Sequence, residues 1–478
     1  MSPNAAAPPR PERPHERSWR TVAVLLFGAV AATALGIGAI AHIPMTADFS
    51  SSTRVTQLVR LLRPRLGPVL LGGGLLGLAL AWLALRRVRL TPRVLVAALV
   101  LWNLPLLLLP PAFSGDLYAY GDHGYALSIG QNPYHVGLGR NDGPFAVFHQ
   151  RGMWADATTL YGPVALRLSQ LAFLFGGGGQ YGTLLALKVV ASTALVVGWF
   201  GLRSLARSLG RDPDVAVWLG LLNPVIGIHV VSAGHNDAMV AVFVVVALWS
   251  AHRGGRLGLL LGAVALAMAI SVKPTPIVLV PAIAFMALPS GWHDRPPSAK
   301  LVSAVGRLVG VTVLTVAATV LIAVACGLGI DWIRAFGVPG RNPTVAPASM
   351  AGQLLTMAGL PGASVMPLVT AAIGFVVLVL LLVRVAPREP WRYAVLALVV
   401  VALAGPALYA WYLIPASIVV GLLAGGRLVS WVVGLGLGLT GGLFVATHYW
   451  FPIIVTESIT IAMCVLAGLA LARWWRPV

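Results

Sequence analysis

Residues Thr21–Ile43 read TVAVLLFGAVAATALGIGAIAHI and contain no acidic residue, lysine or arginine. A helix needs about 20 apolar residues to cross the hydrocarbon core of a bilayer, whereas the apolar part of a secretory signal has only about 7–15. Comparable stretches recur along nearly the whole chain. Because a backbone in lipid must satisfy its own hydrogen bonds, the sequence predicts an all-α, polytopic transmembrane helical bundle.

The composition excludes a water-soluble globular protein. Of the 478 residues, 58% are hydrophobic and 10% are charged, whereas soluble domains contain about 25% charged residues. The net charge of +19 would suit nucleic acid, but the basic side chains lie mainly in short loops between apolar stretches, where they set membrane orientation. We therefore expect the lipid bilayer as a partner and no nucleic acid. The two cysteines, Cys326 and Cys464, are predicted to be core residues.

The pattern of arginines predicts a topology for a multi-pass plasma-membrane protein. We expect a disordered cytoplasmic tail over residues 1–20 and one membrane domain over residues 21–478. The predicted spans, about thirteen or fourteen, begin near Thr21, Gly67, Val94, Gln180, Asp214, Asp237, Leu257, Ile277, Leu308, Val365, Tyr393, Tyr412, Leu428 and Pro452. Arginines then fall on alternate loops, which places both termini in the cytoplasm. This orientation requires Tyr161–Phe175 to lie flat on the outer surface as an interfacial helix.

The largest predicted outer loop covers residues 110–179 and is rich in Tyr, Trp, His, Asn and Asp. It is too long for a simple connector, and loops of this kind on a rigid scaffold commonly carry catalytic residues. We expect short helices within it. The chemistry is therefore predicted to take place on the extracytoplasmic face.

Within this loop, Phe113–Gly130 reads FSGDLYAYGDHGYALSIG and predicts a helix. Asp116, Tyr120 and His123 share one face of that helix by three- and four-residue spacing. Two interpretations of Asp116 stay open: an acid that stabilises the helix dipole, or a general base at the membrane surface. Asp122 is the weaker candidate for a base.

Aromatic residues form a second group of candidates. Tyr134, Trp154 and Tyr161 lie in the outer loop, and Trp411 lies near the outer end of a late span. Such side chains stack on sugar rings in binding sites, and they also mark the interfaces of a membrane. The sequence alone leaves both interpretations open for the three loop residues. For Trp411 it leaves open a lipid groove or an interfacial belt.

A third group follows a span that Asn223-Pro224 is expected to kink. His235, Asn236 and Asp237 lie together where a new helix begins, which suits an anion or hydroxyl site at a helix N-terminus. An N-cap would explain Asn236 or Asp237 without any ligand. It would not explain the neighbouring histidine.

The fourth candidate is Lys273, in the sequence Lys-Pro-Thr-Pro between two apolar spans. A lysine at membrane depth normally has a partner, and a lipid phosphate is one interpretation. Snorkelling of the ammonium group to the headgroups is the other. Arg341, in a later outer loop, is a further candidate for contact with a phosphate.

Motifs for other kinds of chemistry are missing from the sequence. Asp212-Pro213-Asp214 has the spacing of a metal and nucleotide-sugar site, but it lies on the predicted cytoplasmic side and is typical of a helix start. The chain contains no GxxxxGK, HExxH or CxxC motif. We expect no cofactor; a divalent metal is compatible with the site but not required.

Taken in order, these motifs resemble the polyprenol-phosphomannose-dependent α-(1→6)-mannopyranosyltransferases, which are membrane glycosyltransferases of the GT-C fold. The matching residues run from about residue 113 to 276, and the later spans agree only in hydropathy and length. The resemblance is carried by Gly115–Tyr120, Asn132-Pro133-Tyr134, Tyr161-Gly162-Pro163, Leu222-Asn223-Pro224, Gly234–Asp237 and Lys273-Pro274.

The resemblance implies a GT-C bundle and an inverting transfer of mannose from a polyprenyl-phosphate-mannose donor to a growing α-(1→6)-mannan of a lipoglycan, of the lipomannan or lipoarabinomannan type. By position, Asp116 would be the catalytic base. Lys273 and His235, supported by Arg341, would bind the donor phosphate. The predicted substrate-binding residues are Tyr120, Tyr134, Trp154, Tyr161, Asn236, Asp237 and Trp411.

Two other functions stay open. Related membrane glycosyltransferases often have Pro-Trp-Tyr-Leu where this chain has Ala410-Trp411-Tyr412-Leu413, so another GT-C enzyme, transferring arabinofuranose or mannose to a different acceptor, is the nearest alternative. A transporter or flippase of lipid-linked sugars would show interrupted helices in two related halves. The sequence shows no such repeat, which makes transport the weaker alternative.

Overall fold

The computed structural model describes residues 14–42, 66–145, 155–286, 288, 291–335, 344–423, 426–449 and 451–474. Over these ranges the chain is helical and contains no strand. The helices are α1 (Pro14–His42), α3 (Leu66–Leu85), α4 (Pro92–Leu108), α5 (Asp116–Ser128), α6 (Pro163–Phe175), α7 (Gln180–Ser208), α8 (Pro213–Leu221), α9 (Pro224–Ile226), η3 (Gly227–Ser232), α10 (Asp237–Arg253), α11 (Gly255–Ile270), η4 (Thr275–Leu279), α12 (Val280–Met286), η5 (Trp292–Asp294), α13 (Pro297–Ala325), η6 (Asp331–Ala335), α14 (Pro347–Met357), α15 (Gly362–Arg384), α16 (Pro390–Ala404), η8 (Ala410–Leu413), α17 (Ile414–Val419), η9 (Val420–Leu423), α18 (Arg427–His448) and α19 (Ile453–Trp474).

The predicted polytopic all-α fold is confirmed. Among the described residues, seven helices are long and apolar enough to cross a membrane: α1, α3, α7, α13, α15, α18 and α19. The pair formed by Pro213–Leu221 and Pro224–Ser232 adds an eighth if it counts as one span, and it is bent by 48°. Asn223-Pro224 lies at this bend, as the sequence predicts.

The expected total of thirteen or fourteen spans is larger than this number. Each predicted span coincides with a helix or with consecutive helices, but several of these have fewer than 18 residues, such as α4, α11 and α16. Prolines explain part of the difference, because Pro276 and Pro415 lie at breaks in the later apolar runs. The total number of crossings therefore stays a prediction.

Helix α1 begins at Pro14, earlier than the predicted start at Thr21. Residues 14–20 therefore belong to a helix and not to the expected disordered tail, since a proline is readily accommodated in the first turn. The rest of that tail, residues 1–13, lies outside the described residues.

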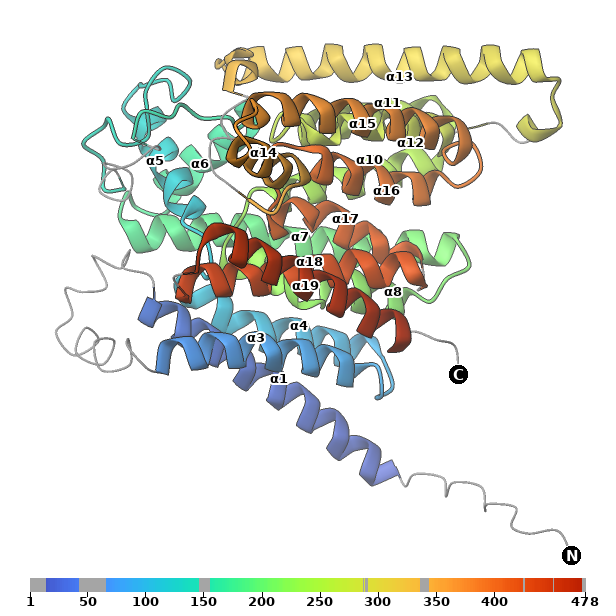
Figure 1. Cartoon of the computed structure of the whole chain (residues 1–478). Helices are drawn as coiled ribbons and strands as arrows, with labels where there is room; N and C mark the ends of the chain where they lie inside the picture. The colour runs from blue at the N-terminus through green and yellow to red at the C-terminus, as the bar shows by residue number, and fades with distance from the viewer. Residues whose placement is uncertain are drawn as a thin grey trace, which may run out of the picture.

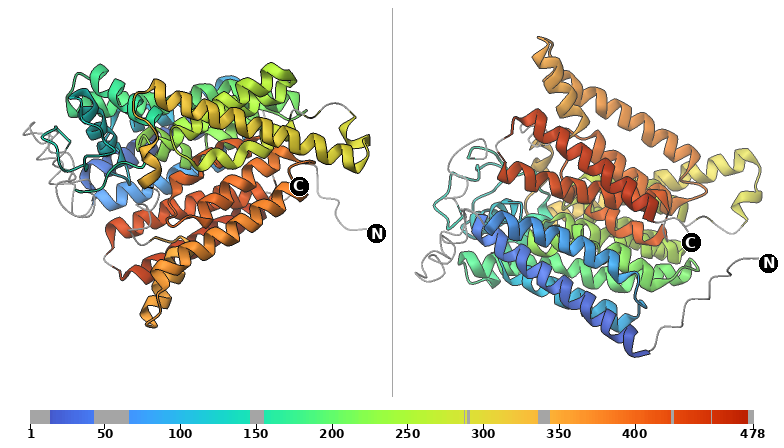
Figure 2. Two further views of the ribbon diagram at one scale, coloured as in Figure 1. Left: turned by 90° about the horizontal axis from the view of Figure 1, so that it is seen from above. Right: turned by 60° about the horizontal axis from the view of Figure 1, so that its bottom comes forward.

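The long helices run side by side, and α5 and α6 pack together at one end of the bundle (Figures 1 and 2). Helix α1 begins and α19 ends at the opposite end (Figure 1). This arrangement places the predicted catalytic loop and the two ends of the described chain on different sides of the bundle. Which of these sides faces the cytoplasm stays a prediction.

Two glycines fix how the loops at this end meet. The φ angle of Gly234 is +61°, and a Cβ atom there would lie 2.5 Å from Leu117 of α5. At Gly162, a Cβ atom would lie 2.2 Å from the carbonyl oxygen of Ser271. The Gly162 N–H donates to the carbonyl of Val272 at 3.0 Å, so this loop is held against the residues that precede Lys273. Close backbone approaches of this kind require glycine.

Candidate active site

Asp116 is the first residue of α5 and lies at a constrained turn. Its backbone N–H donates to the Ser114 hydroxyl at 3.2 Å. Phe113 is the one non-glycine residue in the described ranges with a positive φ, at 65°. Such strained residues persist where the surrounding structure holds them, and they cluster at functional sites. The carboxyl group of Asp116 is 34% exposed, so a ligand can reach it.

The side chain of His235 lies beside the carboxyl group of Asp116. Its Nδ1 atom lies 3.5 Å from Oδ2 of Asp116, and the histidine side chain is fully buried. Burial raises the pKa of Asp116, but His235, the charge of Lys273 and the hydroxyl of Ser114 lower it by more, and the net pKa shift is downward. Asp116 is therefore ionised at neutral pH. A carboxylate in this state can accept a proton.

Lys273 is paired with Asp237. The ammonium Nζ donates to both carboxylate oxygens, at 2.9 and 3.0 Å, and the two side chains are only 8% and 4% exposed. The same Nζ lies 3.9 Å from the centre of the Tyr412 ring. Lys273 and Asp237 are predicted from the sequence as separate ligands for a substrate, whereas in the structure they are partners of each other. Because the charge of Lys273 also acts on Asp116, both groups belong to one site.

Asn236 is at the N-cap position of α10, but its side chain makes no capping hydrogen bond. Both its amide nitrogen and its amide oxygen are buried without a hydrogen-bond partner in the described structure. Asn236 is thus the N-cap by position, as predicted, but capping does not account for its side chain. A buried amide with no partner is costly unless a ligand or water satisfies it, which favours a binding role.

A column of three rings covers one side of the cluster. The rings of His235 and Trp411 stack at 4.1 Å with an angle of 14°, and those of Trp411 and Tyr409 stack at 4.4 Å with an angle of 4°. Tyr412 meets both Tyr409 and Trp411 edge-on. Trp411 is only 6% exposed. It is thus part of the cluster and not an exposed belt residue.

The aromatic residues of the predicted outer loop form a second group of rings. Tyr120 and His123 of α5 both meet the Tyr161 ring edge-on, at 5.2 and 6.0 Å. The hydroxyl of Tyr134 donates to the backbone carbonyl of Tyr161 at 3.1 Å. Tyr134 therefore positions Tyr161. Its hydroxyl is already used for that contact.

Asp122 is separate from this cluster. It is 1% exposed and accepts a hydrogen bond of 2.9 Å from the amide of Asn141. Burial raises its pKa to about 7, and the hydrogen bond from Asn141 only partly opposes this shift. A carboxyl group that is sealed from solvent cannot meet a substrate, so the structure favours Asp116 of the two candidate bases.

Two predicted site residues, Trp154 and Arg341, lie outside the described residues. His229 is a residue of the cluster that was not predicted from the sequence, and its ring lies 5.8 Å from the rings of both His235 and Trp411. His229 is in the π-helical turn η3, and its Nε2 lies 2.9 Å from the Thr440 hydroxyl. A histidine within an apolar span is itself a signal of function.

The ion pair opens onto a cavity of about 250 Å³ between η4, α16 and α17. Lys273, Asp237 and Tyr412 lie on its wall, and most of the remaining wall is apolar, including Leu398 and Val401. Pockets with an apolar lining and a few polar groups are typical ligand sites. Within the described ranges, no group of three or more His, Cys, Asp or Glu side chains is arranged to hold a metal ion.

Comparison with known proteins assigns the chain to a family. Residues 25–289 match the family model described as the N-terminal domain of α-(1→6)-mannopyranosyltransferase, and this match covers more than half of the chain. The chain belongs to the α-(1→6)-mannopyranosyltransferase family. The family predicted from the motifs is thereby confirmed.

Individual relatives agree with the family match. α-(1→6)-mannopyranosyltransferase A of Corynebacterium glutamicum is 27% identical over 267 residues, which are 53% of each chain. The Mycobacterium tuberculosis protein of the same name is 28% identical over 278 residues, which are 56% of this chain and 52% of the relative. A probable α-(1→6)-mannopyranosyltransferase of Mycolicibacterium smegmatis is 26% identical over 374 residues, 70% of this chain and 66% of the relative.

The chain spans about half the length of the first two of these relatives. The region matched by the mannopyranosyltransferase family model contains Asp116, His235 and the Lys273–Asp237 pair. Tyr409 and Trp411 follow that region. The charged part of the site thus lies within the region matched by the family model, and Tyr409 and Trp411 of the stacked rings come from the later part of the chain.

Proposed function

We propose that this protein is an inverting mannosyltransferase that uses polyprenyl-phosphate-mannose to extend the α-(1→6)-mannan of a lipoglycan, of the lipomannan or lipoarabinomannan type. The reaction would take place on the extracytoplasmic face of the plasma membrane. The observation that carries the proposal is the contact of Asp116 with buried His235, in the same cluster as the Lys273–Asp237 pair. The names of the relatives support transfer of mannose.

The proposed reaction is a single displacement. The acceptor hydroxyl is a weak nucleophile, so a base within about 2.6–3.2 Å must take its proton as its oxygen bonds to the anomeric carbon. Asp116 takes that proton. The bond between the anomeric carbon and the phosphate oxygen breaks at the same time, and its electron pair stays on the phosphate. Attack from the face opposite the leaving phosphate inverts the configuration to α.

The leaving monophosphate gains negative charge and needs cations or hydrogen-bond donors directed at it. Lys273 is the cation closest to the apolar cavity that would receive the start of the polyprenyl chain. The phosphate would compete with Asp237 for the ammonium group. His235 and the unpartnered amide of Asn236 provide further donors.

The decisive test is transfer in vitro from a defined mannosyl phosphopolyprenol to an α-(1→6)-mannoside, with linkage analysis of the product. Asp116→Asn removes the base at constant size, and we expect a loss of about 10²–10⁴-fold in turnover with donor binding retained. Asp122→Asn is the matched control, because it makes the same change on the same helix outside the site, and we expect normal turnover.

Two outcomes would contradict the proposal. Near-normal turnover in Asp116→Asn would eliminate that residue as the base. Transfer from an arabinofuranosyl phosphopolyprenol in preference to the mannosyl donor would identify the alternative GT-C activity.

A further inference from the structure

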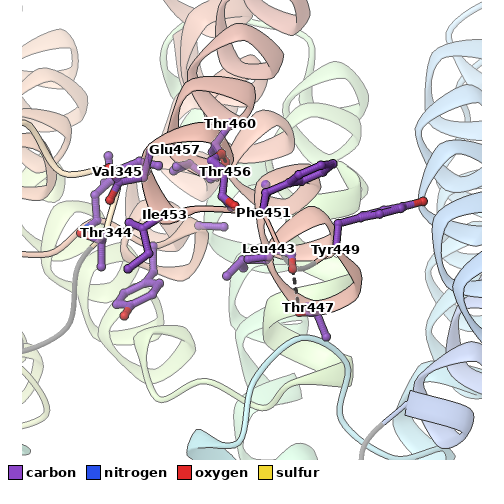
Figure 3. A pocket seen from close by; sticks show the side chains of 16 residues that line it. Thr344, Val345, Leu443, Thr447, Tyr449, Phe451, Ile453, Thr456, Glu457 and Thr460 are labelled. Atoms are coloured by element: carbon purple, nitrogen blue, oxygen red, sulfur yellow. Dashed lines mark hydrogen bonds between the residues drawn. The ribbon is translucent and has the colours of Figure 1, made fainter. Parts of the chain in front are cut away.

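A second cavity lies on the other side of the Tyr409–Tyr412 segment. Its volume is about 400 Å³, and its wall comes from residues 344–345, residues 408–410 and the facing parts of α18 and α19. Figure 3 shows that side chains from both helices and from the 344–345 segment surround this space. Residues 407 and 412 line the cavity of the ion pair, so one short segment separates the two cavities.

The cavity contains a buried carboxylate. Glu457 is the single acidic residue of α19, and it is only 5% exposed. Its Oε1 accepts a hydrogen bond of 3.0 Å from Gln353 of α14. A carboxylate within an apolar helix is costly and marks a functional site by default. The bond from Gln353 orients Glu457 but does not neutralise it.

The threonines around Glu457 also present oxygen atoms to the cavity. The hydroxyl of Thr447 donates to the carbonyl of Leu443 at 2.7 Å, and that of Thr460 donates to the carbonyl of Thr456 at 2.8 Å. Since these hydrogens are already committed, both hydroxyls can only accept from a ligand. These acceptors and the carboxylate repel anions, whereas Leu408, Leu439 and Leu443 belong to the apolar part of the wall. The cavity therefore suits a neutral ligand that combines hydroxyl donors with apolar faces.

Tyr409 connects this cavity to the candidate active site. Its ring lines the cavity and stacks on Trp411, which stacks on His235 beside Asp116. Burial and the nearby Asp116 carboxylate raise the pKa of Tyr409 to about 12. Asp116 does not line this cavity, so the stacked rings are the connection between a ligand held there and the base.

We infer that this cavity holds the sugar residues at the non-reducing end of the acceptor glycan, with Glu457 accepting hydrogen bonds from their hydroxyls. Aromatic faces beside hydrogen-bond acceptors are how proteins bind sugar rings. This inference rests on the proposed function. It adds a subsite formed by residues that follow the region matched by the family model.

Binding of an α-(1→6)-linked mannotetraose to the purified full chain tests the subsite without requiring turnover. Glu457→Gln removes the charge at constant size, and we expect the dissociation constant to rise at least tenfold. Ala446→Trp fills the cavity from its exposed rim, with little risk to folding, and we expect the same loss. Leu466→Trp is the control, because Leu466 is 65% exposed on α19 and does not line the cavity.

In the transfer assay, the first two variants should raise the KM for the mannoside and leave donor binding unchanged. Equal mannoside binding by all four proteins, or no binding by the unaltered protein, would overturn the inference. Mannoside binding that depends on Glu457 and Ala446, without mannose transfer by the unaltered protein, would instead contradict the proposed function and keep the subsite.

Discussion

The Lys273–Asp237 pair offers the sharpest test of how the charged cluster works. Both side chains are more than 90% buried, and the ammonium group reaches both carboxylate oxygens at 2.9 and 3.0 Å. Removing one partner of such a pair leaves a buried charge without compensation and costs about 3–5 kcal/mol. Replacing both partners removes the charges together. The double variant should therefore recover much of the loss.

We expect Asp237→Asn and Lys273→Met each to lower the free energy of unfolding by about 3–5 kcal/mol, and the double variant to lose much less than their sum. Denaturation in mixed detergent micelles, followed by circular dichroism, measures the three losses. A coupling energy below about 0.5 kcal/mol would refute the pairing, since independent sites add within that margin.

Donor binding separates a phosphate ligand from a purely structural pair. Without its carboxylate partner, the ammonium group of Asp237→Asn is free to meet the donor phosphate, so we expect donor affinity to be kept or increased. Lys273→Met should weaken it at least tenfold. Titration with mannosyl phosphopolyprenol measures both. Equal losses in the two variants would refute the assignment of Lys273 to the phosphate.

Three further predictions concern single positions. Gly162→Ala places a Cβ atom 2.2 Å from the carbonyl oxygen of Ser271, so the loop must shift; we expect a loss of about 1–3 kcal/mol in unfolding free energy and reduced transfer activity. Trp411→Leu removes the ring that stacks on His235, and we expect turnover to fall at least tenfold with donor binding retained, as measured in the transfer assay. The pKa of Asp122 is raised from 3.8 to about 7, so its ionisation in the folded protein opposes folding, and stability falls as the pH rises through this window. Asp122→Asn removes that effect. Relative to the unaltered protein, the variant should become more stable as the pH rises from 4 to 8, by at most about 4 kcal/mol in the free energy of unfolding, and its melting temperature measured across this range should rise accordingly.

The places of Asp116 and His235 at helix ends could be predicted from the sequence, because short local motifs determine where those helices begin and end. Asp116 begins a helix where the polar loop predicts one, and His235 ends a span that the Asn-Pro pair bends. Both signals depend on a few adjacent residues. The predicted topology also places both side chains at the same end of the bundle, but their contact at 3.5 Å depends on how the helices pack.

The partner of Lys273 did not follow from the sequence. Lys273 and Asp237 are 36 positions apart, and each has a sufficient local explanation: snorkelling for the lysine and helix capping for the acid. Their pairing depends on how α10 and the turn before η4 pack in three dimensions. The same holds for Trp411, whose burial on His235 depends on a contact between distant parts of the chain.

The stacked rings also explain how the later part of the chain can govern the base. His235 is fully buried, and neither of its ring nitrogens has a hydrogen-bond partner among the described residues. The orientation of its ring is therefore set largely by the Trp411 face, nearly parallel at 4.1 Å, together with the contact to Asp116 at 3.5 Å. Because His235 in turn lowers the pKa of Asp116, a change in the ring column reaches the carboxylate without touching it. On this argument, the segment from Tyr409 to Tyr412 tunes the base as well as separating the two cavities, and substitutions there should alter turnover more than donor affinity.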